Sequence, residues 1–283
     1  MQQNKQDQSP TVQILGADID VLNYQSACEQ IDAQIERKEK GYVCVVPVHS
    51  VIVGTENKTH QQALKESFMN TPDGMPLVWV QKLMGQRHAE RVYGPDLMLH
   101  LLRQAELKGH RVFLYGSQPE TLIKLKDRIL KKFPALRLAG AMSPPFGDLD
   151  EEAEKSHCRS INRRKSDLVF VALGCPNQEA WMLRNHHHLD AVAIGVGAAF
   201  DFLAGTISQA PKRMQKLGLE WLFRLMCEPR RLWKRYLFTN TAFIARLLVQ
   251  FVRGPWPSAV ARERAVEARQ IGVESAQPSA TSR

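Results

Sequence analysis

The segment TPDGMPLVW at residues 71–79 presents a carboxylate where it could act on a substrate. Asp73 stands between Pro72 and Gly74, and an apolar run follows at once. Proline fixes its own φ angle and glycine permits a tight turn, so the pattern predicts a loop tip followed by a helix. A carboxylate held at a loop tip could serve as a general base. Alternatively, Asp73 only caps the helix that begins near Met75.

The elements that must position this loop alternate between strand and helix patterns. Apolar strands are expected at residues 42–48, 111–115, 136–139, 167–173 and 191–196, with helices at 58–69 and 120–132. Such alternation predicts an α/β fold, in which a parallel Rossmann-like sheet carries helices on both faces. Ligands bind beyond the carboxyl ends of the strands in these sheets, so the loops after the strands should carry the chemistry.

Glycine-rich loops follow three of these strands, with the sequences GSQ at 116–118, GCPNQE at 174–179 and GVGAAFD at 195–201. Glycine lets the backbone approach a phosphate, and the N-terminus of a following helix offers free N–H donors. The loops therefore favour a phosphate-bearing ligand, although each by itself could also be an ordinary turn. None completes the Gly-x-Gly-x-x-Gly fingerprint of dinucleotide-binding enzymes, so NAD is not expected.

Length, charge and cysteine content limit the class of protein. A chain of 283 residues can bury a sizeable core, and its net charge of +9 indicates an anionic partner. Its five cysteines lack CxxC spacing, which fits a reducing compartment and argues against a disulfide framework or a zinc site. Residues 1–10 lack the apolar core of a signal peptide, and no run of about 18 apolar residues occurs. We therefore expect a soluble or peripheral cytoplasmic protein.

Residues 211–253 form a basic block in which Trp, Leu, Phe and Tyr are interleaved with arginine and lysine. Pro229 should separate two helices, and Arg224, Arg231 and Arg235 fall on one helical stripe. Basic residues beside Trp and Leu suit a helix that lies on an anionic membrane surface. A solvated basic face packed on the domain fits the charge pattern equally well. Nucleic acid is not expected, because no recognised motif accompanies the block.

The composition divides the chain into four expected segments. They are a disordered lead-in at 1–11, a Rossmann-like domain at 12–210, a basic amphipathic helical appendage at 211–253 and a disordered tail at 254–283.

Two further patterns do not indicate a metal site or a nucleophile. Three successive helix positions, His186 to His188, point about 100° apart and cannot converge on one ion. Nothing in the sequence marks a base beside Cys175, so packing is the expected role of this side chain. The expected absence of an Asp-x-Asp triplet leaves no obvious carboxylate pair for a divalent ion that bridges a diphosphate, so no metal is expected.

Six motifs in order resemble the WecG/TagA/CpsF family of bacterial glycosyltransferases (glycosyltransferase family 26). They are PDGMPLVW (72–79), ERVYGPDLM (90–98), RVFLYGS (111–117), ALGCPNQEAW (172–181), AIGVGAAFDFLAG (193–205) and APKRMQKLGLEWLFRLMCEPRRLWKRY (210–236). The resemblance runs from about Ile14 to Tyr236, which is most of the expected folded chain.

The resemblance implies a Rossmann-like catalytic domain with a C-terminal appendage that docks on the inner face of the cytoplasmic membrane. It implies transfer of a sugar from a UDP-sugar, with inversion and without a metal ion or other cofactor, to a polyprenyl-diphosphate-linked sugar. The best-known members transfer N-acetylmannosamine to undecaprenyl-diphosphate-linked N-acetylglucosamine, and relatives assemble exopolysaccharides with other sugars. A homo-oligomer is compatible with the resemblance.

The same resemblance implies roles for individual residues. Asp73 would be the catalytic base, Gln178 and Arg91 would line the active site, and Asp201 would hold the ribose. The acceptor diphosphate and the membrane would meet Arg224, Arg230, Arg231, Lys234 and Arg235. Further substrate-binding positions would be His49, Ser50, Gly116, Gly174, Asn177, Gly195 and Gly197. The family's Thr-x-Asn motif is absent from residues 45–50, where His49 and Ser50 could substitute, and this departure leaves the donor sugar open.

Two other functions compete with this one. A soluble UDP-sugar epimerase or dehydrogenase would carry a dinucleotide fingerprint after its first strand, and none is seen. A non-catalytic membrane-associated assembly protein of the same pathway would be favoured by loss of Asp73 or Gln178, and both are present.

Overall fold

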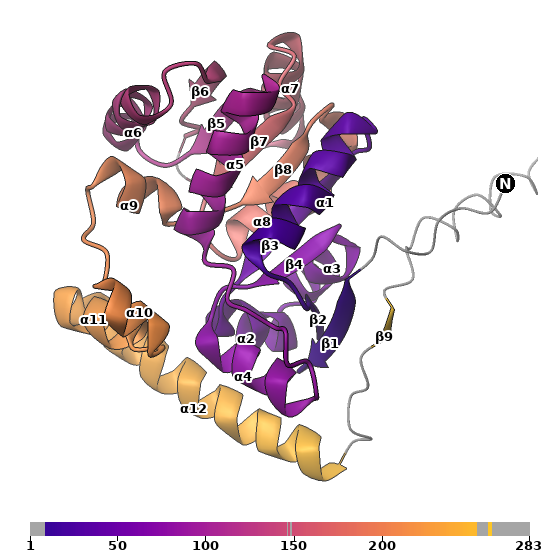
Figure 1. The fold of residues 1–283 in the computed structure, drawn as a ribbon, viewed down its shortest axis with the longest axis vertical. Coiled ribbons are helices and arrows are strands. Elements are labelled where there is room, and N and C mark those ends of the chain that lie inside the picture. Colours follow the sequence, from indigo (N-terminus) through magenta and orange to yellow (C-terminus); the bar gives the residue numbers. More distant parts are fainter. Residues whose placement is uncertain (1–8, 146, 148, 254–259, 262–283) are drawn as a thin grey trace, which may run out of the picture.

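Six parallel strands form the central sheet of this computed structural model, which describes residues 9–145, 147, 149–253 and 260–261 (Figure 1). The strand order is β4–β3–β8–β7–β5–β6, and each neighbouring pair is parallel. The strands are β3 (Gly41–Val46), β4 (Met69–Pro72), β5 (Arg111–Gly116), β6 (Arg137–Met142), β7 (Leu168–Ala172) and β8 (Val192–Gly195). Parallel strands end at one edge of the sheet, so the loops after β4, β3, β8, β7 and β5 gather there.

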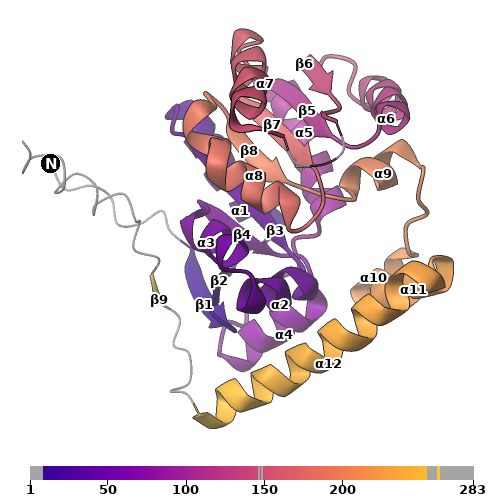
Figure 2. The ribbon, with the colours of Figure 1, turned by 180° about the vertical axis from the view of Figure 1, so that it is seen from behind.

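Helices cover both faces of the sheet, as Figures 1 and 2 show from opposite sides. One face carries α1 (Tyr24–Glu36), α5 (Gly94–Lys108), α6 (Pro119–Lys132) and α9 (Ala199–Ala204). The other carries α2 (Val48–Glu56), α3 (Lys58–Glu66), α4 (Met75–Leu83), α7 (Glu151–Arg163) and α8 (Asn177–Asn185). Along β3, Val43 and Val45 pack into the first core, whereas Tyr42, Cys44 and Val46 pack into the second. The Rossmann-like α/β fold predicted from the two-sided apolar strands is therefore confirmed.

A small antiparallel sheet, which the sequence did not predict, flanks the main one. It contains β1 (Pro10–Ile14), β2 (Ala17–Asp20) and β9 (Val260–Ala261), in the order β2–β1–β9. Thus β1 begins inside the expected lead-in, and β9 lies inside the expected tail. The rest of the tail, 254–259 and 262–283, and residues 1–8 lie outside the described residues.

Two expected elements end earlier than predicted, and the strand expected at 136–139 ends three residues later, as β6. The helix expected at 58–69 ends at Glu66, and β4 begins three residues later as an edge strand of the main sheet. Buried Asn70 holds that strand in place, because its amide Nδ2 donates to the carbonyls of Asp18 and Leu64. The strand expected at 42–48 ends at Val46, and α2 starts at Val48.

The C-terminal appendage consists of α10 (Lys212–Lys216), α11 (Glu220–Cys227) and α12 (Pro229–Arg253). Pro229 begins α12, as the sequence predicted, and the 25 residues of this helix span about 38 Å. The helix crosses below α2 and α4 (Figure 1) and packs against α2. Near its end, Arg246 Nη2 lies 2.6 Å from Glu56 Oε1, and Gln250 Oε1 accepts a 3.0 Å hydrogen bond from the Leu15 N–H. Within the described ranges, no helix is both long enough and apolar enough to cross a membrane.

Candidate active site

Asp73 lies at the carboxyl edge of the sheet, in the loop between β4 and α4. Its backbone N–H donates to the Val46 carbonyl at 3.0 Å, which ties the loop to the end of β3. Its Oδ1 accepts a 3.4 Å hydrogen bond from the Gly94 N–H. The N-cap of α4 is Gly74, and no side chain caps that helix. The capping role considered for Asp73 is therefore wrong.

The environment of Asp73 favours a carboxylate that titrates near neutral pH. Burial raises the pKa of Asp73 to about 6, and the negative charge of Glu220 acts in the same direction. The Arg91 guanidinium, whose Nη2 lies 3.5 Å from Asp73 Oδ1, opposes this rise. A base with such a pKa is ionised at neutral pH and still accepts a proton readily.

Arg91 connects the Asp73 loop to the appendage. Its Nε donates to the backbone carbonyl of Asp73, and its Nη2 donates to Glu220 Oε2 of α11 at 2.7 Å. Its Cζ also lies 4.2 Å from the centre of the Tyr93 ring. The guanidinium is thereby fixed next to Asp73. Glu220 was not predicted, although it is one of only two acidic residues in the basic block.

Gln178 occupies the first turn of α8 and packs over the glycines that follow β8. A Cβ atom added at Gly195 would lie 3.1 Å from Gln178 Nε2, so glycine is needed for this approach. Gln178 Nε2 donates to Glu179 Oε1 at 2.8 Å. Its Oε1 is buried and has no hydrogen-bond partner among the described residues, so it could accept a hydrogen bond from a ligand.

A buried polar chain lies behind Gln178. Burial raises the pKa of Glu179 to about 7 and lowers the pKa of His60 to about 4. His60 Nε2 lies 2.8 Å from Ser50 Oγ, and Ser50 is completely buried. Because α2 starts at Val48, its first turn directs His49 to the cavity and Ser50 into the core. Ser50 is therefore not at the substrate surface where it was predicted.

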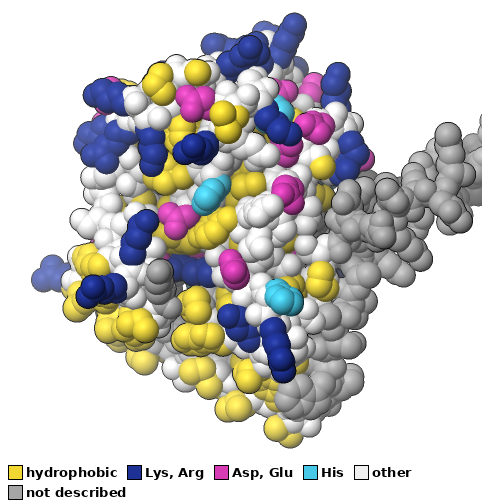
Figure 3. Space-filling model, in the orientation of Figure 1, with side chains coloured by type: hydrophobic (Ala, Val, Ile, Leu, Met, Phe, Trp, Pro, Cys, Tyr) yellow, Lys and Arg dark blue, Asp and Glu magenta, His cyan; other side chains and the backbone are white. Residues whose placement is uncertain are grey.

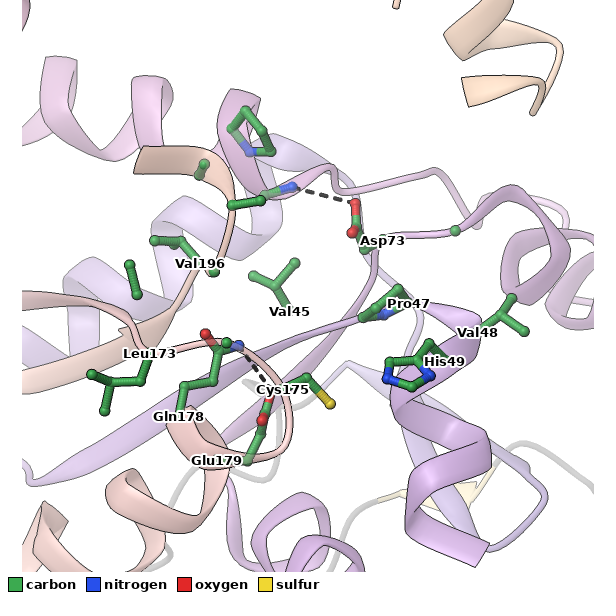
Figure 4. A pocket seen from close by; sticks show the side chains of 18 of the residues that line it. Val45, Pro47, Val48, His49, Asp73, Leu173, Cys175, Gln178, Glu179 and Val196 are labelled. Carbon is green, nitrogen blue, oxygen red and sulfur yellow. Dashed lines mark hydrogen bonds between the residues drawn. The ribbon is translucent and has the colours of Figure 1, made fainter. Parts of the chain in front are cut away.

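One large cavity brings most of the predicted residues together. Its volume is about 1430 Å³, and it opens between the carboxyl edge of the sheet and helices α11 and α12. In Figure 4, Asp73 and Gln178 approach the cavity from different elements, with His49 and Cys175 nearby. The predicted residues that line it are His49, Asp73, Arg91, Gly174, Asn177, Gln178, Gly197, Asp201 and Arg224. Gly116 and Gly195 stand behind the lining, where a Cβ at Gly116 would lie 2.4 Å from the Ala172 carbonyl oxygen.

The basic residues of the appendage separate into two groups. Arg224 lines the cavity, where its Cζ lies 5.5 Å from the centre of the Phe202 ring. Its Nε is buried and has no hydrogen-bond partner in the described part of the chain. Arg230 and Lys234 are instead exposed at the start of α12. The side chains of Arg231 and Arg235 lie outside the described structure.

Exposed apolar side chains accompany these charges along the appendage. Figure 3 shows hydrophobic side chains gathered along the lower edge of the molecule, where α10–α12 run in Figure 1. The exposed members on α11 and α12 are Trp221, Leu222, Met226, Trp233, Leu237, Phe238, Ile244, Leu248, Val249 and Val252. Single exposed apolar residues are common on protein surfaces, whereas a group of this size along one segment is typical of an interaction surface.

Among the described residues of the patterns considered for metal binding, the three histidines at 186–188 and Asp18, Asp20 and Asp150 do not line this cavity. His186 is buried, and its Nδ1 contacts the Met182 and Leu183 carbonyls. The expectation that the sequence lacks an Asp-x-Asp triplet is wrong, because two occur, at 18–20 and 148–150. Asp20 accepts from the Asn70 N–H, and Asp150 caps α7 by accepting from the Ala153 N–H at 2.7 Å. Residue 148 lies outside the described residues.

Comparisons with known proteins agree with the geometry. The model of the glycosyl transferase WecG/TagA/CpsF family matches residues 12–256. The chain is 36% identical over 184 residues to N-acetylglucosaminyldiphosphoundecaprenol N-acetyl-beta-D-mannosaminyltransferase of Bacillus spizizenii, covering 64% of this chain and 69% of the relative. It is 32% identical over 205 residues to the enzyme of the same name from Bacillus subtilis strain 168, covering 72% of this chain and 77% of the relative.

Proposed function

This chain belongs to the WecG/TagA/CpsF family of glycosyl transferases, and on that premise we propose that it transfers a hexose or N-acetylhexosamine from a UDP-sugar to a sugar linked to undecaprenyl diphosphate. It is a glycosyltransferase, and its relatives' names specify an N-acetylmannosaminyl donor group and an undecaprenyl-diphosphate-linked acceptor. The observation that carries the proposal is the Asp73–Arg91 pair, which faces a cavity of about 1430 Å³ bounded by the basic appendage.

The proposed reaction is a direct displacement with inversion. Asp73 takes the proton of the acceptor hydroxyl while that oxygen forms a bond to the anomeric carbon of the donor sugar. The bond from that carbon to the diphosphate breaks, and UDP leaves with the electron pair. Arg91 and the N–H groups at the start of α8 support the charge that develops on the leaving group. Gln178 Oε1 accepts a hydrogen bond from the substrate, and Asp201 holds the ribose.

Metal independence of the transfer step is part of the proposal, and it rests on three of the cavity carboxylates, those of Asp73, Glu220 and Glu154. Arg91 contacts both Asp73 and Glu220, and Arg184 Nη2 lies 2.6 Å from Glu154 Oε1. Guanidinium groups therefore occupy these carboxylates, whereas an ion that bridges a diphosphate needs carboxylates open to it.

The appendage is proposed to meet the lipid-linked acceptor at the inner face of the cytoplasmic membrane. Arg224 offers a buried Nε without a partner among the described residues, which suits the acceptor diphosphate. Arg230 and Lys234, together with the exposed Trp221 and Trp233, suit an anionic lipid surface.

A donor panel tests the proposal. The full chain is incubated with several UDP-sugars and a short polyprenyl-diphosphate-linked N-acetylglucosamine, and UDP release and the disaccharide product are measured. We expect UDP release that requires the acceptor and one UDP-sugar of the N-acetylhexosamine or hexose class. Absence of product with every donor, from a folded protein, would favour the non-catalytic assembly role instead.

A further inference from the structure

A second polar cluster lies at the side of the cavity, where α3 packs against α8. It contains His60 of α3, Cys175 of the loop between β7 and α8, and Glu179 of α8. One ligand atom from each residue, a ring nitrogen, the sulfur and a carboxylate oxygen, lies within 4.8 Å of the other two. His60 and Glu179 are each 1% exposed, so two of the three groups sit inside the protein.

Two buried polar atoms in this cluster face each other but do not form a hydrogen bond. His60 Nδ1 lies 3.8 Å from Glu179 Oε2, which is too far for a hydrogen bond. Neither atom makes a hydrogen bond of good geometry among the described residues, although the Cys175 thiol is close enough to the Glu179 carboxyl to lower its pKa. Leaving such atoms buried and unpaired is unfavourable, because neither protein nor water replaces the lost hydration. A cation between them would satisfy both.

We propose that His60 Nδ1, Cys175 Sγ and Glu179 Oε2 form a binding site for Zn²⁺. Nitrogen, thiolate and carboxylate ligands together are the set that Zn²⁺ accepts, in preference to the all-oxygen sets of Mg²⁺ and Ca²⁺. Bond lengths of about 2.0–2.3 Å place the ligand atoms of a tetrahedral Zn²⁺ about 3.3–3.8 Å apart. The distance of 3.8 Å between His60 Nδ1 and Glu179 Oε2 already fits that range, and Cys175 Sγ lies within 4.8 Å of ligand atoms of both residues.

Surrounding groups prepare the ligands and give the ion a route of entry. The hydrogen bond between Ser50 Oγ and His60 Nε2 fixes the ring with Nδ1 toward Glu179. Gln178 Nε2 donates a hydrogen bond to Glu179 Oε1, so the other carboxylate oxygen, Oε2, is the one that would bind the ion. Cys175 and Glu179 both line the cavity, so the ion reaches the site from solvent and its fourth position faces the cavity. The Cys175 thiol releases its proton to solvent when the ion binds.

This site is separate from the proposed transfer chemistry and does not depend on it. Its ligands come from positions 60, 175 and 179, a spacing with no zinc-binding signature, so the cysteine pattern alone gave no sign of it. Bound Zn²⁺ would join α3 to α8 and hold the loop that carries Asn177 and Gln178. The expected consequence is a more stable protein rather than a catalytic ion.

Cobalt substitution tests the site, since Co²⁺ bound to a thiolate gives a near-ultraviolet charge-transfer band. The metal-free full chain is titrated with Co²⁺ and then with Zn²⁺ in competition. We expect one equivalent to bind with the charge-transfer band and the melting temperature to rise with Zn²⁺. Cys175→Ala should remove the band and weaken Zn²⁺ binding by at least about 10- to 100-fold. Losses of this size in metal affinity already follow from mutating residues that only hydrogen-bond to a metal ligand.

Matched variants separate this site from other metal-binding groups. Glu179→Gln keeps the side-chain shape and should weaken binding, whereas Cys227→Ala, at an exposed cysteine of α11, should bind like the wild type. His187→Ala combined with His188→Ala should likewise leave binding unchanged. The site is refuted if Cys175→Ala binds Zn²⁺ as tightly as the wild type, or if the two surface histidines account for the binding.

Discussion

Acidification should switch off transfer with a midpoint near pH 6, because Asp73 must be ionised to accept the acceptor proton. With a pKa of about 6, about 9% of Asp73 is ionised at pH 5 and about 91% at pH 7. The specificity constant kcat/KM, measured by UDP release between pH 4.5 and 8.5, should therefore rise about tenfold between these two values and then level off.

The position of this midpoint should depend on Glu220. Its negative charge raises the pKa of Asp73, and its contact with Arg91 draws the guanidinium away from Asp73. Glu220→Gln removes both effects, so the pKa of Asp73 should fall by about one unit and activity should persist to lower pH. Glu228→Gln, at the other acidic residue of the appendage, is the control and should leave the midpoint unchanged. An unaltered pH profile in Glu220→Gln, with wild-type protein titrating near pH 6, would refute the assignment of Asp73 as the titrating base.

Four further outcomes are expected. Asp73→Asn should lower kcat by about 10²–10⁴-fold with donor affinity little changed, and near-normal turnover would exclude the base role. The same variant should also unfold at a higher temperature at pH 7.5 but not at pH 4. At pH 7.5 the wild-type Asp73 is ionised, and because its pKa is raised in the folded state, this ionisation lowers the free energy of unfolding by up to about 3 kcal/mol. Activity should survive excess EDTA, and its loss in EDTA with recovery in Mg²⁺ or Mn²⁺ would contradict metal independence. The double variant Arg230→Glu with Lys234→Glu should weaken binding to anionic vesicles by at least about 30-fold, since each cation contributes about 1 kcal/mol. Its melting temperature should stay unchanged. A lower melting temperature with intact vesicle binding would favour simple packing of this face on the domain.

The fold followed from the sequence wherever strands were long and apolar on both faces. β5, β7 and β8 were all expected within one or two residues, because short apolar runs that are rich in β-branched and aromatic residues and are followed by glycine favour a strand over a helix. β4 was missed because it is four residues long and contains Asn70 and Thr71, which look like a loop. The burial of Asn70 is explained by its hydrogen bonds to Asp20 and Asp18 of β2, which lie 50 and 52 residues earlier.

The site was predictable where its residues share a motif and not where they meet across the chain. Asp73, Arg91 and Gln178 were found through the family resemblance, and the cavity brings them together. Glu220 is 129 residues from Arg91, and only the docking of α11 reveals their contact. Ser50 was misplaced because the start of α2 decides which of two adjacent side chains faces the cavity. A shift of one residue on a helix turns a side chain by about 100°.

The appendage also bears on how such enzymes could be redesigned. One wall of the cavity comes from a single continuous segment, α11 and the middle of α12, while the opposite wall comes from loops scattered over the preceding part of the chain. The far end of α12 is fixed to the body by the hydrogen bonds of Arg246 and Gln250. A graft that exchanges the segment between Pro211 and Ile244 but keeps these anchors would therefore renew most of one side of the binding site in a single step. Selectivity for one of two substrates could change by transplanting a module, without altering the sheet-edge loops.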